Sequence, residues 1–190
     1  MRKSKVETAE TRRRIVEVAA QQFRSKGIQG TGLNDVMAEA GLTHGGFYRH
    51  FESKNQLVAE ACELGFAGVV DSFNALASQA DGKAAFASMV DSYVSSAHRD
   101  NAAGGCPLAG MGSELARADE VTRETATEGF KKIVDVLAKG MKSKRSADDT
   151  SDAMFALAAM VGAITLSRVV SDTGASDAVL QTVKDHLDRL

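Results

Sequence analysis

Several side chains between residues 43 and 54 are of types that bind phosphate groups, and five of them are candidates for such contacts. They are Thr43, His44, Tyr48, His50 and Lys54. Hydroxyl, imidazole and ammonium groups are common hydrogen-bond donors to the phosphates of nucleic acids. Gly45 and Gly46 leave the start of this segment without side chains, which allows a large partner to approach the backbone closely.

Cys106 is the residue with the most scope for covalent chemistry. It follows Gly104 and Gly105 and precedes Pro107, a residue favoured at the first position of a helix. A thiol at a helix N-terminus is predicted to have a lowered pKa, because the peptide dipoles favour the thiolate. The alternative is that Cys106 is a small buried apolar residue, as we expect for Cys62. The four histidines are dispersed and neither cysteine has a partner at zinc spacing, so no metal and no cofactor are predicted.

Helices are the elements that must position these side chains. One proline in 190 residues, with abundant Ala, Glu, Lys and Leu and few aromatic residues, favours an all-α chain. Residues 8–25 carry apolar side chains at helical spacing, and a second helix is predicted over 33–40. A third covers 43–51, and Ser53 caps a fourth that continues to about residue 78.

The second and third helices are joined by Gly41, Leu42 and Thr43 in the manner of a helix-turn-helix. Glycine allows the tight end of the second helix, and Leu42 is expected to fill the angle between the two helices. The third helix then presents its first turn to base edges and its far end to phosphate. Phe47 and Phe51, four residues apart, are predicted to be core residues of this unit.

Five further helices are predicted after residue 82, about nine in all. They cover residues 83–100, 107–118, 119–142, 151–172 and 176–190, with a charged loop over 142–150. The helix over 151–172 is apolar nearly all round, so more than one of its faces must be covered. A buried central helix of a monomer and a helix between subunits both satisfy this requirement.

Charge is distributed unevenly along the chain. Residues 1–60 carry 10 Lys and Arg against 7 Asp and Glu, whereas residues 61–190 carry 13 against 18. This asymmetry indicates that one end meets a polyanion. No window approaches the roughly 18 uninterrupted apolar residues of a membrane span, and the basic N-terminus lacks the apolar stretch of a signal peptide. We therefore expect a cytoplasmic protein without a membrane segment.

The stretch from Gly27 to Lys54 closely resembles the DNA-binding region of tetracycline-repressor-type (TetR family) regulators. The matching core is Ala-Gly-Leu-Thr at 40–43, Gly-Phe-Tyr-Arg-His-Phe at 46–51 and Ser-Lys at 53–54. The resemblance covers about residues 10–60. It implies a three-helix DNA-binding domain over 1–55 and an all-helical ligand-binding and dimerisation domain over 56–190.

The resemblance also implies roles for individual residues. Thr31, near the start of the second helix, would touch a phosphate. Thr43, His44, Gly45 and Gly46 would face the major groove of double-stranded DNA, and Tyr48, His50 and Lys54 would hold its backbone. The run Arg12–Arg14 is either a solvated helix face or part of a basic arm that reaches towards DNA.

The same resemblance implies a homodimer in which the 151–172 helix and the last helix form an intersubunit four-helix bundle. A two-fold dimer predicts a palindromic operator with half-sites about 34–36 Å apart. A small-molecule effector would bind between the middle helices. Its candidate lining residues are Phe66, Phe73, Phe86, Met89, Tyr93, Cys106, Met111 and Phe130, each of which is also a candidate for plain core.

The leading hypothesis is a transcriptional repressor released by a small molecule or a thiol-reactive compound. The Gly-Cys-Pro-Leu segment around Cys106 looks like a subgroup of the family in which some members respond to electrophiles or oxidants. Two other hypotheses remain open. One is a thiol redox enzyme with Cys106 as nucleophile, for which only His98 is a nearby base in sequence. The other is a helical interaction protein whose DNA-reading helix has decayed.

Overall fold

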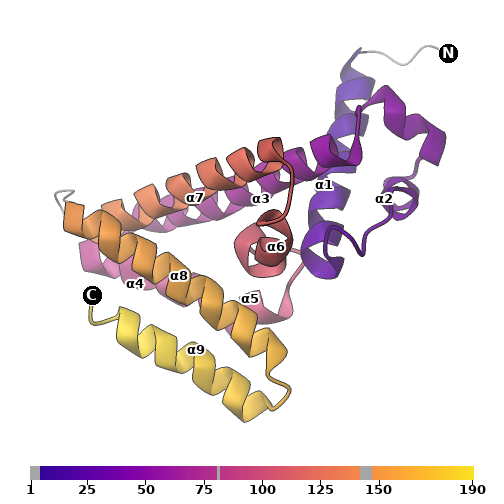
Figure 1. Ribbon diagram of the computed structural model, residues 1–190. Coiled ribbons are helices and arrows are strands. Elements are labelled where there is room, and N and C mark those ends of the chain that lie inside the picture. The colour runs from indigo at the N-terminus through magenta and orange to yellow at the C-terminus, as the bar shows by residue number, and fades with distance from the viewer. Residues whose placement is uncertain (1–4, 81, 142–146) are drawn as a thin grey trace.

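The computed structural model describes residues 5–80, 82–141 and 147–190, and in these residues it contains helices and no strand (Figure 1). The elements are α1 (Lys5–Lys26), α2 (Leu33–Glu39), the 3-10 helix η1 (His44–Arg49), α3 (Lys54–Ala77), α4 (Gly82–Tyr93), α5 (Ser96–Asp100), α6 (Pro107–Leu115), α7 (Glu120–Met141), α8 (Ala147–Val169) and α9 (Thr173–Leu187). The predicted all-α class is confirmed.

Short-range signals set the boundaries of the first four helices. Gly27 and Gly41 follow α1 and α2 with φ angles of 80° and 72°, a left-handed conformation that costs glycine little. The Ser53 hydroxyl accepts a hydrogen bond from the Gln56 amide at 3.1 Å and caps α3. The order of helix, turn and helix predicted over residues 33–51 is confirmed, although the second helix is a 3-10 helix that ends at Arg49.

The predicted helix over 83–100 is two helices in the structure. Ser95 has extended backbone angles, φ −133° and ψ 154°, and its hydroxyl accepts from the His98 amide at 3.1 Å. The extended backbone of Ser95 separates the two helices, and its side chain caps the N-terminus of α5. The loop predicted over 142–150 is also corrected, because α8 begins at Ala147; residues 142–146 of that loop lie outside the described residues.

α3 connects the two ends of the molecule (Figure 1). It packs against α1 near its start and against α7 along its length, while α2 and η1 lie beyond α1 at one end. The buried apolar residues form one continuous cluster that includes Ile15 of α1, Leu57 of α3 and Ile133 of α7. The domain boundary predicted at residues 55 and 56 falls in the first turn of α3 and stays a prediction.

α8 has one covered side and one open side. It packs against α5, α6, α7 and α9, and Ala153, Ala156 and Ala163 on the covered side are buried. Phe155 and Leu166 are 61% and 56% exposed. The segment Asp149–Val169, with a mean hydropathy of 1.5, is long and apolar enough to cross a membrane by length and composition, and 39% of that window is buried in the molecule.

Candidate nucleic-acid interface and effector cavity

η1 is anchored on one side and exposed on the other. Phe47 and Phe51 are buried, as predicted, and their rings stack with centroids 5.4 Å apart. On the outer side, Tyr48 is 66% exposed. The other exposed residues of this edge are Thr43, His44, Gly45 and Arg49, and Gly46 is half-buried. The anchoring aromatic pair therefore holds a short surface whose first turn carries few side chains.

Gly45 leaves open space on this surface. A Cβ atom added at Gly45 would meet no atom within 4 Å, whereas one added at Gly46 would lie 3.6 Å from the Met37 methyl group, an ordinary contact. Thr43 occupies the N-cap position of η1 without a capping hydrogen bond from its side chain. Its hydroxyl thus stays at the surface, available to a partner.

The expectation for Thr31 is corrected. Its side chain is 1% exposed, and its hydroxyl donates to the carbonyl oxygen of Gly27 at 2.7 Å. The hydroxyl closes the loop between α1 and α2, so it is not presented to a phosphate.

Lys54 and Arg12 also make internal contacts. The Lys54 Nζ donates to the carbonyl oxygens of Ile28 and Thr31 at 2.6 and 2.7 Å, so this half-buried ammonium organises the loop before α2. Arg12 forms a two-pronged ion pair with Glu60 at 2.5 and 2.6 Å. Its guanidinium carbon also lies 4.5 Å from the Phe51 ring centroid. Arg12 is therefore a structural link from α1 to α3, unlike the solvated face or arm expected for it.

His50 is half-buried at the end of η1. Its carbonyl oxygen accepts a hydrogen bond from Arg12 Nε at 3.3 Å. Its neighbour Arg49 is exposed and belongs to the motif, although it is not among the predicted site residues. The feature that could have identified Arg49 as a phosphate contact is its positive charge in the last turn of the predicted third helix.

A cavity of about 410 Å³ lies between α1, α3 and the α4–α6 region. It is lined by Arg24 of α1, by α3 between Leu64 and Phe73, and by residues between Ser92 and Cys106. Its volume falls in the range of about 300–1,000 Å³ that is typical of small-molecule sites. The sequence does not predict Arg24 as a lining residue, because nothing in its sequence neighbourhood distinguishes it from a surface arginine.

Three of the predicted lining residues belong to this cavity: Phe73, Tyr93 and Cys106. Four others are buried in the core and do not line it: Phe66, Phe86, Met89 and Met111. Phe130 lies half-buried in a separate depression between α6 and α7. The sequence identified apolar residues of the right helices but could not separate the core from the cavity wall.

Cys106 differs from the expectation in its ionisation. It does occupy the N-cap of α6, but it is 1% exposed, and burial raises the pKa of its thiol. The nearby Tyr93 hydroxyl, the amides of Leu108 and Ala109 and the charge of Arg24 act in the opposite direction without reversing the shift. The predicted lowering of the pKa is therefore wrong, because loss of water outweighs the helix end.

His98 is not placed as a base for that thiol. Its Nε2 accepts a hydrogen bond from the backbone amide of Cys106 at 3.1 Å, and its Nδ1 lies 2.7 Å from the carbonyl oxygen of Tyr93. Both ring nitrogens are therefore used to hold the backbone. Among the described residues, no group of three or more His, Cys, Asp and Glu side chains is placed to hold a metal ion.

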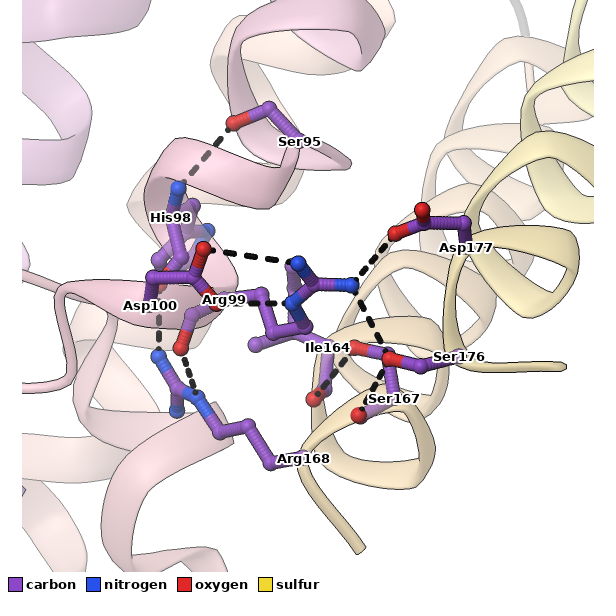
Figure 2. Close-up of polar contacts among 9 residues, drawn as sticks. All are labelled: Ser95, His98, Arg99, Asp100, Ile164, Ser167, Arg168, Ser176 and Asp177. Atoms are coloured by element: carbon purple, nitrogen blue, oxygen red, sulfur yellow. Dashed lines mark hydrogen bonds and ion pairs between the residues drawn. The ribbon is translucent and has the colours of Figure 1, made fainter. Parts of the chain in front are cut away.

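α5, which carries part of the cavity wall, is tied to α8 and α9 (Figure 2). Arg168 of α8 donates from Nε to the carbonyl oxygen of Arg99 at 2.9 Å and from Nη2 to that of His98 at 2.8 Å. Arg99 in turn donates from Nη1 to Asp177 at 2.6 Å and to Ser176 at 3.0 Å, both on α9. These hydrogen bonds thus link the cavity wall to the two C-terminal helices.

The loop between α1 and α2 is held by α6. Both carboxylate oxygens of Glu114 accept hydrogen bonds at 2.9 Å, one from the Ile28 amide and one from the Gln29 amide. Arg24, at the end of α1, donates from Nε to the carbonyl oxygen of Ala103 at 2.7 Å. The region from Ala103 to Glu114 beside the cavity therefore hydrogen-bonds to the end of α1 and to the loop that leads into α2.

An all-α molecule with an exposed helix-turn-helix at one end and a cavity behind it belongs to the class of DNA-binding transcriptional regulators. Residues 15–61 match the model of bacterial regulatory proteins of the tetR family, and residues 83–186 match that of the C-terminal domain of LmrA/YxaF-like transcriptional regulators. The chain belongs to the TetR family. Members of this family are regulators, so the redox-enzyme hypothesis has no support.

Individual relatives agree with this assignment. The AcrR regulator of Shigella flexneri is 41% identical over 63 residues, which cover 33% of this chain and 29% of that relative. The LmrA regulator of Bacillus subtilis is 26% identical over 187 residues, 95% of this chain and 98% of the relative. A TetR transcriptional regulator from Chloroflexus aurantiacus is similar in structure, with a TM-score of 0.80, 26% identity and coverage of 97% and 95% of the two chains.

Proposed function

We propose that this TetR-family regulator is a cytoplasmic homodimeric repressor that binds a palindromic operator and is released when a small molecule enters the cavity. The observation that carries the proposal is the edge of η1 between Thr43 and Tyr48. It is exposed, it starts with open space at Gly45, and its backbone is held from behind by Phe47 and Phe51. Such an edge suits a helix that enters a major groove. The exposed edge gives no support to a decayed DNA-reading helix.

The open side of α8 supports the dimer. Phe155, Ala159, Gly162, Leu166 and Val169 recur at the spacing of one helix face, and all are partly or fully exposed. A Cβ at Gly162 would meet no atom within 4 Å, so another helix could approach closely there. Association through this face would remove apolar surface from water and place two copies of η1 on one face of DNA.

The contacts around the cavity support release by an effector. A ligand that shifts the segment from Ala103 to Glu114 would pull on Arg24 and on the amides of Ile28 and Gln29. These contacts lie directly before α2, so the angle of the helix-turn-helix would change. A thiol-reactive effector would reach Cys106 only after it had entered the cavity, because the thiol is buried.

Selection of genomic DNA fragments by the purified protein tests the proposal. We expect enrichment of one palindromic sequence, a footprint with two-fold symmetry, and an affinity that falls steeply with salt because phosphate contacts supply much of it. An asymmetric footprint, or specific binding by a monomer, would contradict the proposal.

Substitution Gly45→Ala tests the DNA-reading edge directly. The added methyl group meets only open space in the free protein, so the melting temperature should stay the same or rise slightly. On DNA the methyl group would intrude into a close approach, and we expect operator affinity to fall at least about tenfold, or about 1.4 kcal/mol.

Gly112→Ala, on α6, is the matched control, since a Cβ there also meets nothing within 4 Å. It should leave operator affinity unchanged. Equal affinities of the two variants and the wild type, measured by fluorescence anisotropy, would show that Gly45 does not face DNA.

A further inference from the structure

The cavity wall has an apolar side and a cationic side. Leu64, Val69 and Phe73 of α3 supply apolar surface, and Arg24 lies at the α1 end. Among the described residues that line the cavity, none is an aspartate or a glutamate. The lining therefore provides a positive charge without a resident counter-charge.

The guanidinium of Arg24 is only partly satisfied by the protein. Its Nε donates to the carbonyl oxygen of Ala103, while neither terminal nitrogen has an acceptor within the described part of the chain. Burial lowers the pKa of Arg24, and the nearby thiols of Cys106 and Cys62 partly oppose this shift. A partly desolvated guanidinium without a carboxylate is costly, and an anion would relieve that cost.

The fold makes room for this guanidinium. A Cβ at Gly65 of α3 would lie 2.7 Å from the Arg24 Nη1 and 2.7 Å from a ring carbon of Pro107. Any side chain at this position would displace the arginine from the cavity wall. Glycine at position 65 therefore keeps the two-pronged donor of Arg24 in place.

A second donor, with only a weak partner in the protein, lies in the wall of the same cavity. The Tyr93 side chain is 4% exposed, and its hydroxyl makes no hydrogen bond of ordinary geometry. It is close enough to the Cys106 thiol for each to influence the other's pKa, but a neutral thiol is a weak partner. The oxygen is buried beside the Cys106 thiol, so a ligand would reach it through a small shift of the Tyr93 side chain, which would exchange a weak partner for a strong one.

We propose that the cavity binds a small organic acid, whose carboxylate pairs with Arg24 and accepts a hydrogen bond from Tyr93 while its apolar body packs against Leu64, Val69 and Phe73. This proposal rests on the proposed ligand-responsive function and names the chemical class of the effector. Arg24 belongs to α1, so the carboxylate would contact the DNA-binding end itself. Binding to the terminal nitrogens would pull on the guanidinium, whose Nε holds the Ala103 carbonyl oxygen, and would shift the end of α1.

Matched pairs of acids and amides test the charge requirement. The probes are aryl and alkyl carboxylic acids below about 300 Da, each with its primary amide, starting with 2-naphthoate and 2-naphthamide. Calorimetry with the full-length protein at pH 7.5 should show at least one acid that binds tenfold or more tightly than its amide. If every acid binds no better than its amide, or no acid binds, the proposal fails.

Variants locate the preference. Arg24→Gln should abolish the tenfold preference, Arg24→Lys should retain part of it, and Tyr93→Phe should weaken the acid more than the amide. Arg14→Gln, an exposed arginine on the same helix, is the matched control and should leave the preference unchanged. Circular dichroism and melting temperature establish that each variant is folded. Retention of the full preference in Arg24→Gln would overturn the proposal.

The effect of the acid on DNA separates the two proposals. If the acid binds through Arg24 and lowers operator affinity, both proposals are supported. If it binds through Arg24 and operator affinity does not change, the anion site stands and the proposed release by an effector fails. If an uncharged molecule releases the operator and no acid binds, the proposed function stands and the anion site fails.

Discussion

His98 joins the last turn of α4 to Cys106, the N-cap of α6, through both ring nitrogens. Because Nε2 accepts from the Cys106 amide, Nδ1 must carry the proton that it donates to the Tyr93 carbonyl oxygen. Only the neutral ring can make both hydrogen bonds. Burial lowers the pKa of His98, Arg168 adds to this effect, and the hydrogen bond to Tyr93 acts against it.

We therefore expect acid to destabilise the fold through His98. As the pH falls below the unfolded value of 6.5, the unfolded chain takes up a proton before the folded one, so the free energy of unfolding decreases. Urea unfolding at pH 7.5 and pH 5.5 should show a smaller decrease in His98→Gln than in the wild type.

His186→Gln is the control for this measurement. His186 is exposed on α9, and its ring Nδ1 lies 2.8 Å from the Thr182 carbonyl oxygen of its own helix. Its removal should leave the pH dependence as it is in the wild type. An equal decrease in all three proteins would exclude His98 as the responsible group.

The residue types predicted which side chains are exposed better than they predicted the hydrogen-bond partners of those side chains. Thr43, His44 and Tyr48 are exposed as the motif implies, because local glycine and phenylalanine signals determine which side of η1 faces inward. Thr31 and Lys54 were expected at phosphates, yet both donate to carbonyl oxygens of the loop before α2. Such partners depend on the path of that loop, which the residue types do not reveal.

At the scale of elements, the loop between α1 and α2 is held from the C-terminal part of the chain. Glu114 of α6 receives the amides of Ile28 and Gln29 with its two carboxylate oxygens. These residues are 85 or more positions apart, so no local pattern could have predicted the contact. The break between α4 and α5 was predictable in principle, since Ser95 is a good N-cap residue.

Substitution Glu114→Gln should loosen this loop. The amide side chain keeps one acceptor oxygen and loses the charge, so one of the two backbone amides loses its partner. The cost is about 1–3 kcal/mol for the buried Ile28 amide and less for the exposed Gln29 amide. Hydrogen exchange at Ile28 and Gln29 should become faster. Glu124→Gln on the exposed side of α7 is the control and should not change these rates. Unchanged exchange in Glu114→Gln would mean that the loop is held by its other contacts.

At the scale of the whole molecule, other helices of the chain cover only one side of α8. Arg168 links it to α5, its alanines are buried, and Phe155 and Leu166 remain at the surface. The sequence predicted that several faces of this helix would be covered. The chain leaves one of them open, and the proposed homodimer would cover that face.

We expect Phe155→Glu with Leu166→Glu to produce a folded monomer with much weaker operator binding. Charges on both positions would oppose burial of this face, and each half-site would then bind separately. Analytical ultracentrifugation and anisotropy measure the two effects. Val121→Glu, a charge at an apolar residue of α7 that is 63% exposed, is the control and should stay dimeric. A double variant that still sedimented as a dimer would place the interface elsewhere.

The sharing of α3 between both ends has a consequence for building hybrid regulators. Arg12 forms an ion pair with Glu60, and Lys54 donates to carbonyl oxygens of the loop before α2. A hybrid protein joined near residue 55 would therefore lose contacts on both sides of the junction. The hydrogen bonds of Arg24 to Ala103 and of Ile28 to Glu114 also cross any such junction. A DNA-binding domain transferred to another regulator should therefore include its contact residues on α3 and α6. Chimaeras that omit these residues should fold poorly or lose their response to the effector.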